Sequence, residues 1–321
     1  MQSKTLFFVM EMELRGYSRP IRPGVTRVGW IGTGVMGAAM AGRILAAGYS
    51  LTVYARTASK AADLASAGAD LVSSAADAAA GADVVFTMVG HPSDVRSVVL
   101  DPVSGVLSTL QAGGVLVDHT SSHPALAREI ASSARARGCW AVDAPVSGGD
   151  VGAREGKLAI FAGGEDGVIQ WLAPLWEILG KATAMGKPGS GQSSKIANQI
   201  TVAGSLLGLS EAMLFVRTIG LDPREFLTVV KEGAARSGTM ELWGDRIIQR
   251  DFRSAGSMEY LIKDLGMALE DDCGSGERGG SPAVLPGAAL CRQLSQAVMA
   301  NREANIGIQG LITAIERING K

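Results

Sequence analysis

The sequence predicts an α/β fold, in which a Rossmann-type doubly wound sheet domain is followed by an all-α domain and one long interdomain helix joins the two. Three observations predict it: apolar strand-like runs alternate with helical stretches, a three-glycine turn follows the first run, and such runs end at a Lys-Pro-Gly-Ser-Gly breaker at residues 187–191. The expected parts are an N-terminal extension at 1–23, an NAD(P)-binding domain at 24–188 and a helical domain for substrate and oligomerisation at 189–321.

The first strand runs into a G-x-G-x-x-G turn that opens a helix. Gly32 permits the tight turn, Gly34 lets the backbone approach a pyrophosphate, and Gly37 lets the helix pack on the strand. The helix N-terminus then faces the phosphates. With 42 glycines in 321 residues the motif alone is weak, but its place between a strand and a helix favours a dinucleotide site over a packing turn. The turn residues expected at the cofactor are Gly32, Thr33, Gly34, Val35 and Met36.

Further elements follow in the same alternation. Their continuous apolar sequence is typical of parallel strands covered on both faces. Strands are expected at 51–54, 83–88, 115–118, 140–143 and 158–161, with a helix at 60–67. The apolar spacing from Gly191 to Ile219 predicts one helix of about 40 Å. The remainder predicts helices at 223–233, 238–249, 258–270 and 288–300, and a loop at 274–286. The active site is expected in the cleft between the domains.

Composition excludes several classes of function. Lys+Arg 30 against Asp+Glu 31 gives a net charge of -1 without a basic block, so nucleic acid is not an expected partner. No uncharged stretch reaches about 18 apolar residues, so no membrane partner is expected. Three widely spaced cysteines indicate core thiols in a reducing, cytoplasmic compartment, while residues 1–23 leave mitochondrial targeting open. The three histidines lack metal-ligand spacing, so no metal site is expected. Apolar faces in the helical domain suggest a homodimer or homotetramer.

The end of the second strand bears on which dinucleotide is bound. NAD-selective Rossmann domains place an acid about 20 residues beyond the glycines, on the ribose 2′-hydroxyl. Here the strand ends Tyr-Ala-Arg-Thr, with Arg56 and the hydroxyl of Thr57 in place of an acid. These residues favour NADP over NAD, which stays open. The alternative reading is that Arg56 is a solvated turn residue.

Two later motifs carry candidate chemistry. Ser147, Gly148 and Gly149 end the stretch Asp-Ala-Pro-Val-Ser-Gly-Gly after a predicted strand, and their hydroxyl and bare N–H groups suit a carboxylate cradle as well as an ordinary loop.

Lys195 and Asn198 are three residues apart near the start of the long helix and share one face. A partly desolvated lysine there can exchange a proton with a substrate hydroxyl or carbonyl, although most lysines are solvated. Hydride transfer then needs no metal.

Over residues 26 to about 320, these motifs together resemble the β-hydroxyacid dehydrogenases, and 118–124 and 284–290 are most similar to the plant 3-hydroxyisobutyrate dehydrogenase-like members. The resemblance implies that Lys195 is the general acid/base, that Asn198 holds the substrate, and that Ser147, Gly148 and Gly149 bind its carboxylate. It also implies cofactor contacts for Val89, Thr120 and Lys263, with Thr120 on the nicotinamide side.

The expected function is NAD(P)-dependent hydride transfer between the nicotinamide and a small β-hydroxy acid or semialdehyde carboxylate, first of all a 3-hydroxyisobutyrate dehydrogenase-like activity. An NADPH-dependent glyoxylate/succinic semialdehyde reductase is the alternative within this chemistry, and a noncatalytic nucleotide-binding module is the alternative of another class. Imine reduction is disfavoured by Lys195. The chain departs from the family pattern at Gln199 and over the stretch 305–308, and the second departure leaves the substrate open.

Overall fold

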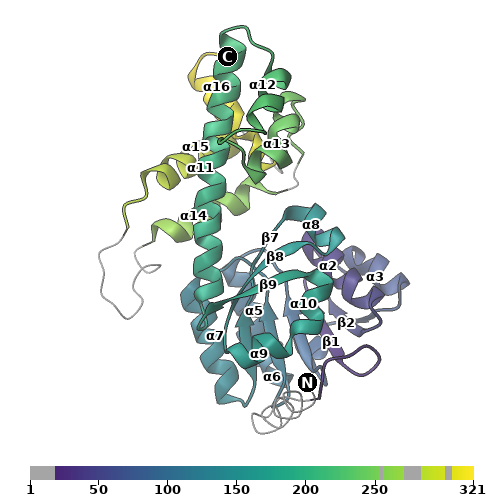
Figure 1. The fold of residues 1–321 in the computed structure, drawn as a ribbon. Helices are drawn as coiled ribbons and strands as arrows, with labels where there is room; N and C mark the ends of the chain where they lie inside the picture. The colour runs from purple at the N-terminus through teal and green to yellow at the C-terminus, as the bar shows by residue number, and fades with distance from the viewer. Residues whose placement is uncertain (1–18, 254–255, 271–282, 301–305) are drawn as a thin grey trace, which may run out of the picture. The chain divides into compact units, whose positions relative to one another are not determined.

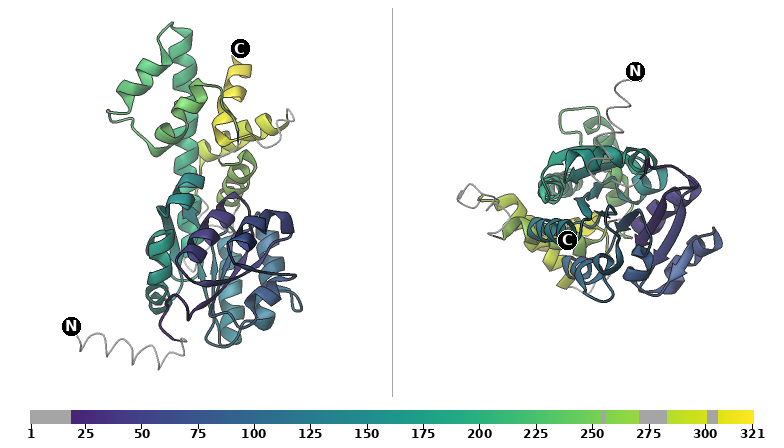
Figure 2. Two further views of the ribbon diagram at one scale, coloured as in Figure 1. Left: turned by 90° about the vertical axis from the view of Figure 1, so that its right-hand side faces the viewer. Right: turned by 90° about the horizontal axis from the view of Figure 1, so that it is seen from below.

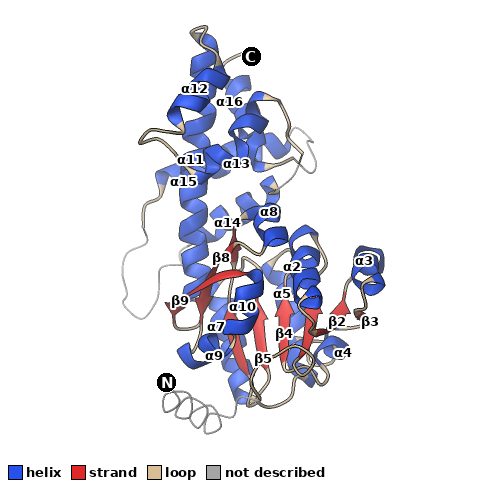
Figure 3. Cartoon of the chain, turned by 45° about the vertical axis from the view of Figure 1, so that its right-hand side comes forward, coloured by secondary structure: helices blue, strands red, loops and turns tan. Residues whose placement is uncertain are grey.

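The computed structural model describes residues 19–253, 256–270, 283–300 and 306–321. Contacts within the chain divide it into two compact units, Met1–Lys195 and Ile196–Lys321. Figure 3 shows the strands in the first unit and helices in both.

The first unit is built on a sheet that is mixed rather than wholly parallel. Among the described residues it has nine strands in the order β3-β2-β1-β4-β5-β6-β8-β7, with β9 beside β8. The first six in that order are parallel, and this order is that of two mononucleotide-binding halves. β8 is antiparallel to β6 and β7 and parallel to β9. The strands are β1 (Arg27–Ile31), β2 (Ser50–Tyr54), β3 (Asp70–Val72), β4 (Val84–Thr87), β5 (Val115–Asp118), β6 (Trp140–Asp143), β7 (Val146–Ser147), β8 (Leu158–Gly163) and β9 (Gly180–Gly186).

Successive residues of the central strands pack on opposite faces of the sheet. Trp30 and Phe86 are fully buried on one face with their rings 5.1 Å apart, whereas Ile31 and Val85 belong to a separate core cluster. Side chains of one strand thus enter two cores, which is why its sequence is continuously apolar. Helices lie over both faces (Figure 1). They are α2 (Val35–Ala46), α3 (Ala62–Ser66), α4 (Ala75–Ala79), α5 (Pro92–Leu100), α6 (Val106–Thr109), α7 (Pro124–Ala136), α8 (Gly149–Glu155), α9 (Asp166–Trp171) and α10 (Ala173–Leu179), with the 3-10 helix η1 (Ala58–Ala61) before α3.

The second unit is helical throughout its described part. Helices gather around the later part of α11 (Ser190–Thr218) (Figure 2). Leu206 and Met213 of α11 are buried in the core that these helices share. These helices are α12 (Pro223–Val230), α13 (Gly238–Ile248), α14 (Met258–Leu269), α15 (Pro286–Ala300), η3 (Ile308–Gly310) and α16 (Leu311–Ile318). Isolated bridges join Arg253 to Ile306 and Ser257 to Gly307. Most of the loop expected at 274–286 lies outside the described residues.

Helix α11 corrects one expectation from composition. It contains an 18-residue window with mean hydropathy 1.5, 39% of it buried, so by length and composition alone it is apolar enough to cross a membrane. Core helices of globular proteins pass the same test. The apolar side chains of Ala203, Leu206, Leu209 and Met213 are buried within the second unit.

Candidate functional site

The glycine turn between β1 and α2 leaves room for a ligand at only one of its three glycines. Gly32 has φ +97°, and an added Cβ there would lie 2.2 Å from the Met88 carbonyl oxygen. A Cβ at Gly37 would lie 2.2 Å from the Gly32 carbonyl oxygen. At Gly34, apart from its chain neighbours and its own helix, a Cβ would meet no heavy atom of the described residues within 4 Å. The fold itself therefore requires Gly32 and Gly37, while Gly34 faces open space at a helix N-terminus, which fits a bound pyrophosphate.

Hydrogen bonds tie the ends of β4 and β5 together. Asp118 Oδ1 accepts from Thr87 Oγ1 at 2.7 Å and from the Thr120 N–H at 3.0 Å. The Val89 N–H donates to Thr120 Oγ1 at 3.0 Å. Because the carboxyl ends of parallel strands share one sheet edge, the structure brings Val89 and Thr120 together at the edge where such folds bind ligands.

Asp143, the last residue of β6, anchors the start of α11. Its Oδ1 accepts from the Gly189 N–H at 2.7 Å and its Oδ2 from the Gln192 N–H at 2.8 Å. Burial raises the pKa of Asp143 to about 7, although these two N–H groups act to lower it. A Cβ at Gly191 would lie 2.4 Å from the Asp143 carbonyl oxygen, so the close approach needs glycine there.

Gln192 connects this helix start to the loop after β5. Its side chain is fully buried, its Oε1 accepts from the Ser122 N–H at 2.8 Å, and its Nε2 donates to the Thr120 carbonyl at 2.7 Å. Sequence reasoning assigned no role to Gln192 or Asp143. Their partners lie 46 to 72 residues away, so no local pattern marks them.

Lys195 follows Gln192 by three residues on α11 and is 8% exposed. It is thus not the solvated surface lysine of the alternative reading. Asn198 lies three residues further on and donates through Nδ2 to Gln199 Oε1 at 3.0 Å.

In the second unit, Gln199 donates in turn to Asp264 Oδ2 at 2.9 Å. Asp264 is paired with Lys263 at 3.2 Å, and only 11% of the Lys263 side chain is exposed. Lys263 is therefore a mostly buried, ion-paired residue. Gln199, a departure from the family pattern, holds the carboxylate of that pair.

The stretch Ser147–Gly149 is more ordered than a loop. Ser147 ends β7 and pairs with Ala159 of β8, and Gly149 opens α8. Gly148 and Gly149 have φ of +135° and +64°, a region that favours glycine. A Cβ at Gly148 would contact Leu158 Cδ2 at 3.2 Å, whereas described residues outside the immediate chain leave open space at Gly149.

At the end of β2, Arg56 is 84% exposed in its side chain and forms an ion pair with Asp94, Nη1 to Oδ1 at 3.1 Å. Asp94 also accepts from the His91 N–H at 3.1 Å, in the first turn of α5. The expectation that no acid is available at this end of β2 is therefore wrong. The acid comes from a segment 38 residues further along the chain.

The buried histidine and cysteines are core groups. His119 is fully buried, its ring lies 5.4 Å from that of Phe86, and its Nδ1 is 2.6 Å from the Ala144 carbonyl oxygen. Burial lowers the pKa of His119 to about 4, so the ring is neutral near pH 7. Burial raises the pKa of Cys139, and that of Cys291 to about 11, while Cys273 lies outside the described residues.

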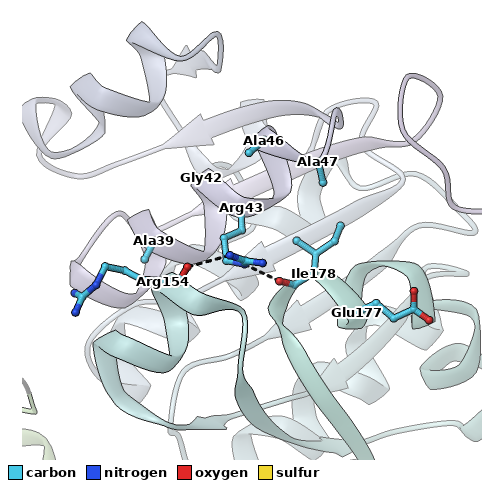
Figure 4. A pocket seen from close by; sticks show the side chains of 8 residues that line it. All are labelled: Ala39, Gly42, Arg43, Ala46, Ala47, Arg154, Glu177 and Ile178. Carbon is cyan, nitrogen blue, oxygen red and sulfur yellow. Dashed lines mark hydrogen bonds between the residues drawn. The ribbon is translucent and has the colours of Figure 1, made fainter.

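A hollow of about 540 Å³ lies over α2, α8 and α10 (Figure 4). Within it Arg43 donates to the Ile178 carbonyl at 2.7 Å and the Arg154 carbonyl at 2.9 Å, near the C-terminal ends of α10 and α8. Arg43 thus satisfies helix-end carbonyls. The lining contains none of the site residues expected from sequence: it is Ala39, Gly42, Arg43, Ala46, Ala47, Arg154, Glu177 and Ile178.

Comparison with known proteins identifies the family over most of the chain. Residues 27–186 match the NAD binding domain of 6-phosphogluconate dehydrogenase, and 189–315 match the NAD-binding domain model of NADP-dependent 3-hydroxyisobutyrate dehydrogenase. A probable 3-hydroxyisobutyrate dehydrogenase-like 3, mitochondrial, from Arabidopsis thaliana is 52% identical over 95% of this chain and 92% of its own length. The chain belongs to the β-hydroxyacid dehydrogenase family. It is an NAD(P)-dependent oxidoreductase acting on CH–OH groups, as expected from its motifs.

Further proteins resemble this chain at lower sequence identity. The 2-hydroxy-3-oxopropionate reductase of Escherichia coli is 35% identical over 90% of this chain and 97% of its own. The 3-hydroxyisobutyrate dehydrogenase of Mycobacterium tuberculosis, solved with L-serine, has a TM-score of 0.78 at 25% identity and covers 90% of this chain and 99% of its own. Psf3, solved with NADP+ and 2-OPP, has a TM-score of 0.81 at 25% identity with the same coverage. These structures confirm a Rossmann-like sheet followed by a helical domain.

Proposed function

We propose that this family member interconverts a small β-hydroxy acid and its semialdehyde, as a 3-hydroxyisobutyrate dehydrogenase-like enzyme, with Lys195 as the general acid/base. The observation that carries the proposal is the buried Lys195 on a helix whose start is hydrogen-bonded to the ends of β5 and β6. A lysine amine can accept a proton in its neutral form and return it as an ammonium, which is the exchange this role requires.

In the oxidation direction the proposed reaction couples loss of a hydride from the substrate to proton transfer at Lys195. A nicotinamide dinucleotide held at the glycine turn and beside Val89 and Thr120 would supply the acceptor for the hydride, with both electrons of the C–H bond, that leaves the carbinol carbon. The Lys195 amine takes the hydroxyl proton and becomes an ammonium, while the carbinol becomes a carbonyl. In reduction the Lys195 ammonium returns that proton to the carbonyl oxygen. Asn198, one turn further along α11, would hold the substrate.

Ser147, Gly148 and Gly149 are the proposed carboxylate cradle. The positive φ values at both glycines and the open space at Gly149 support this role, because backbone N–H groups with no side chain over them can meet an anion. Every candidate substrate carries a carboxylate, so the cradle alone does not select among them.

For the cofactor we propose NADP in preference to NAD. Arg56 and Thr57 follow β2, where a 2′-phosphate would be recognised, and charge-assisted contacts of Arg with phosphate are strong. Asp94 opposes this preference, because its carboxylate shares Arg56 and would repel the phosphate. The expected selectivity is therefore modest. Val89, Thr120 and Lys263 are further proposed cofactor contacts.

We also propose an oligomeric state and a cellular location. A homo-oligomer is supported by the end of α11 and the turn after it, where Phe215, Ile219 and Leu221 are 64%, 53% and 56% exposed, since such apolar side chains gain from being covered. Light scattering should give a dimer or tetramer, which Phe215→Glu should weaken.

A mitochondrial location is supported by the names of the plant relatives, and imaging of the tagged full chain tests it.

The deciding experiment is a substrate panel. Glyoxylate, succinic semialdehyde, methylmalonate semialdehyde and tartronate semialdehyde are each assayed with NADPH and NADH, and kcat/KM is compared. Methylmalonate semialdehyde with NADPH is expected to give the highest value. Highest values for glyoxylate or succinic semialdehyde would favour the alternative reductase. Cofactor binding without turnover of any of the four would overturn the proposal.

A further inference from the structure

The side chain of Gln192 is buried at the start of α11. Its carboxamide is fully buried and forms two hydrogen bonds with the backbone of one loop. Oε1 accepts from the Ser122 N–H, and Nε2 donates to the Thr120 carbonyl. Burying an amide without hydrogen-bond partners is destabilising, so the site tolerates Gln only while both bonds are made. The side chain therefore fixes the distance between α11 and this loop.

The two segments joined by Gln192 carry different parts of the proposed chemistry. On the helix side, Lys195 is three residues on, a spacing that places the two side chains on one face of α11. On the loop side, Thr120 accepts from the Val89 N–H and is held by Asp118, so the loop is itself bonded to the ends of β4 and β5. Movement of Gln192 would shift Lys195 relative to this sheet edge.

The anchor at Asp143 does not make Gln192 redundant. Asp143 bonds the main-chain N–H groups of Gly189 and Gln192 and so fixes where α11 begins beside β6. The Gln192 side chain adds a second attachment, to the neighbouring strand end. Two attachments on different strands restrict rotation of the first turns of the helix as well as its position.

We infer that Gln192 is a positioning residue for proton transfer, which holds the turn of α11 carrying Lys195 in register with the Thr120–Ser122 loop. The inference rests on the proposed function of Lys195. Misplacement of a reacting group by about 1 Å can cost about 100-fold in rate, so a residue that touches no substrate can still act on kcat.

Two substitutions test it. Gln192→Met has similar length and removes both hydrogen bonds. Gln192→Glu keeps the shape, and its protonated form restores the same pattern, with the carbonyl accepting from Ser122 and the hydroxyl donating to Thr120. Its ionised form instead places a carboxylate against the Thr120 carbonyl. Burial and that carbonyl should raise the pKa of the introduced carboxyl.

The assay is reduction by NADPH of the aldehyde of the four-member panel that the wild-type protein reduces fastest. Gln192→Met should lower kcat by about 10- to 100-fold at every pH, with the Kd for NADPH within a few-fold of wild type. Relative to wild type, kcat of Gln192→Glu should recover as pH falls from about 8 to about 6. NADPH deuterated at C4, the position that gives the hydride, reports on the chemical step. The isotope effect on kcat should rise in Gln192→Met, because hydride transfer with its coupled proton transfer then limits the overall rate.

Ser193→Ala is the matched control. Ser193 is exposed on the same turn, and its hydroxyl bonds only the Gly189 carbonyl among the described residues, so kcat should not change. A purely structural Gln192 would lower the amount of folded protein but leave kcat per folded molecule, its pH profile and the isotope effect at wild-type values, and that outcome overturns the inference. Failure of the proposed function is a different result: full turnover by Lys195→Ala.

Discussion

The guanidinium of Arg56 is bound to the carboxylate of Asp94 at 3.1 Å, across two segments at the adenosine end of the expected cofactor site. A 2′-phosphate and Asp94 would compete for the same cation. Because Arg56 is 84% exposed, solvent and salt screen both interactions, and neither is worth much alone.

Arg56→Ala should therefore raise the Kd for NADPH only a few-fold and leave that for NADH nearly unchanged. Asp94→Asn should tighten NADPH a few-fold, because the competing charge is gone. Both effects should shrink as salt rises from about 50 to about 500 mM. Fluorescence titration with the two cofactors measures all of this, and equal weakening of NADPH and NADH in Arg56→Ala would show that selectivity lies elsewhere.

Removing the Lys195 amine should stop the chemistry while sparing the binding. Lys195→Ala is expected to lower kcat by about 10²–10⁴-fold, with the Kd for NADPH changed by no more than a few-fold, because general acid/base catalysis contributes on that scale. Steady-state rates and titration of the same preparation provide the check. Wild-type turnover in this variant contradicts the mechanism.

The glycine turn offers a matched pair of substitutions. Gly34→Val should abolish NADPH binding and leave the melting temperature close to wild type, since the added side chain enters open space. Gly37→Val should destabilise the fold, because its Cβ would lie 2.2 Å from the Gly32 carbonyl oxygen. Thermal melts and NADPH titration separate the two, and normal NADPH binding by Gly34→Val would mean that the open space holds no phosphate.

His119 should make the free energy of unfolding depend on pH. Its pKa is about 4 in the folded chain and about 6.5 when unfolded, so between these values the unfolded state binds more protons. This contribution is complete above about pH 6.5 and is lost as pH falls, by about 2 kcal/mol at about pH 4.5. Asp143, whose pKa is raised to about 7, acts in the opposite direction over the same range.

The comparison of wild type with His119→Phe isolates the histidine, because Asp143 is common to both. Urea unfolding at a series of pH values should show the free energy of unfolding of wild type falling relative to that of His119→Phe as the pH decreases below about 6.5. Parallel curves would mean that His119 titrates normally in the folded chain.

Sequence alone predicted the elements whose pattern is local. The apolar runs at 115–118 and 140–143 are β5 and β6 with the predicted bounds, and α11 begins within one residue of its expected start. The exposed strand β9, Gly180–Gly186, has no continuous apolar run, because it is held by backbone pairing to β8. The helix α16 was not expected although it is strongly amphipathic, and the predicted helix at 60–67 is a 3-10 turn followed by α3.

At the site, too, features with a local sequence pattern were predicted and features that depend on long-range contacts were not. The glycine turn and the helix start near Lys195 are recognisable because each is contiguous in sequence. The partners that fix them are not: Asp143 meets Gly189, Gln192 meets Thr120, and Arg56 meets Asp94 only after the sheet has formed. Such pairs depend on the order of the strands in the sheet. The order of elements along the chain does not predict which residues will meet.

The unequal demands on the three turn glycines also bear on how a protein of this family could lose its cofactor over evolutionary time. Selection for folding alone keeps Gly32 and Gly37 in place, since any side chain there collides with backbone. Only selection for the ligand keeps Gly34, because the fold leaves that position open. In a lineage that is no longer selected for catalysis, substitutions should therefore accumulate at Gly34 first. A descendant with an intact fold and a bulky residue at that position would have lost cofactor binding and with it the enzymatic activity.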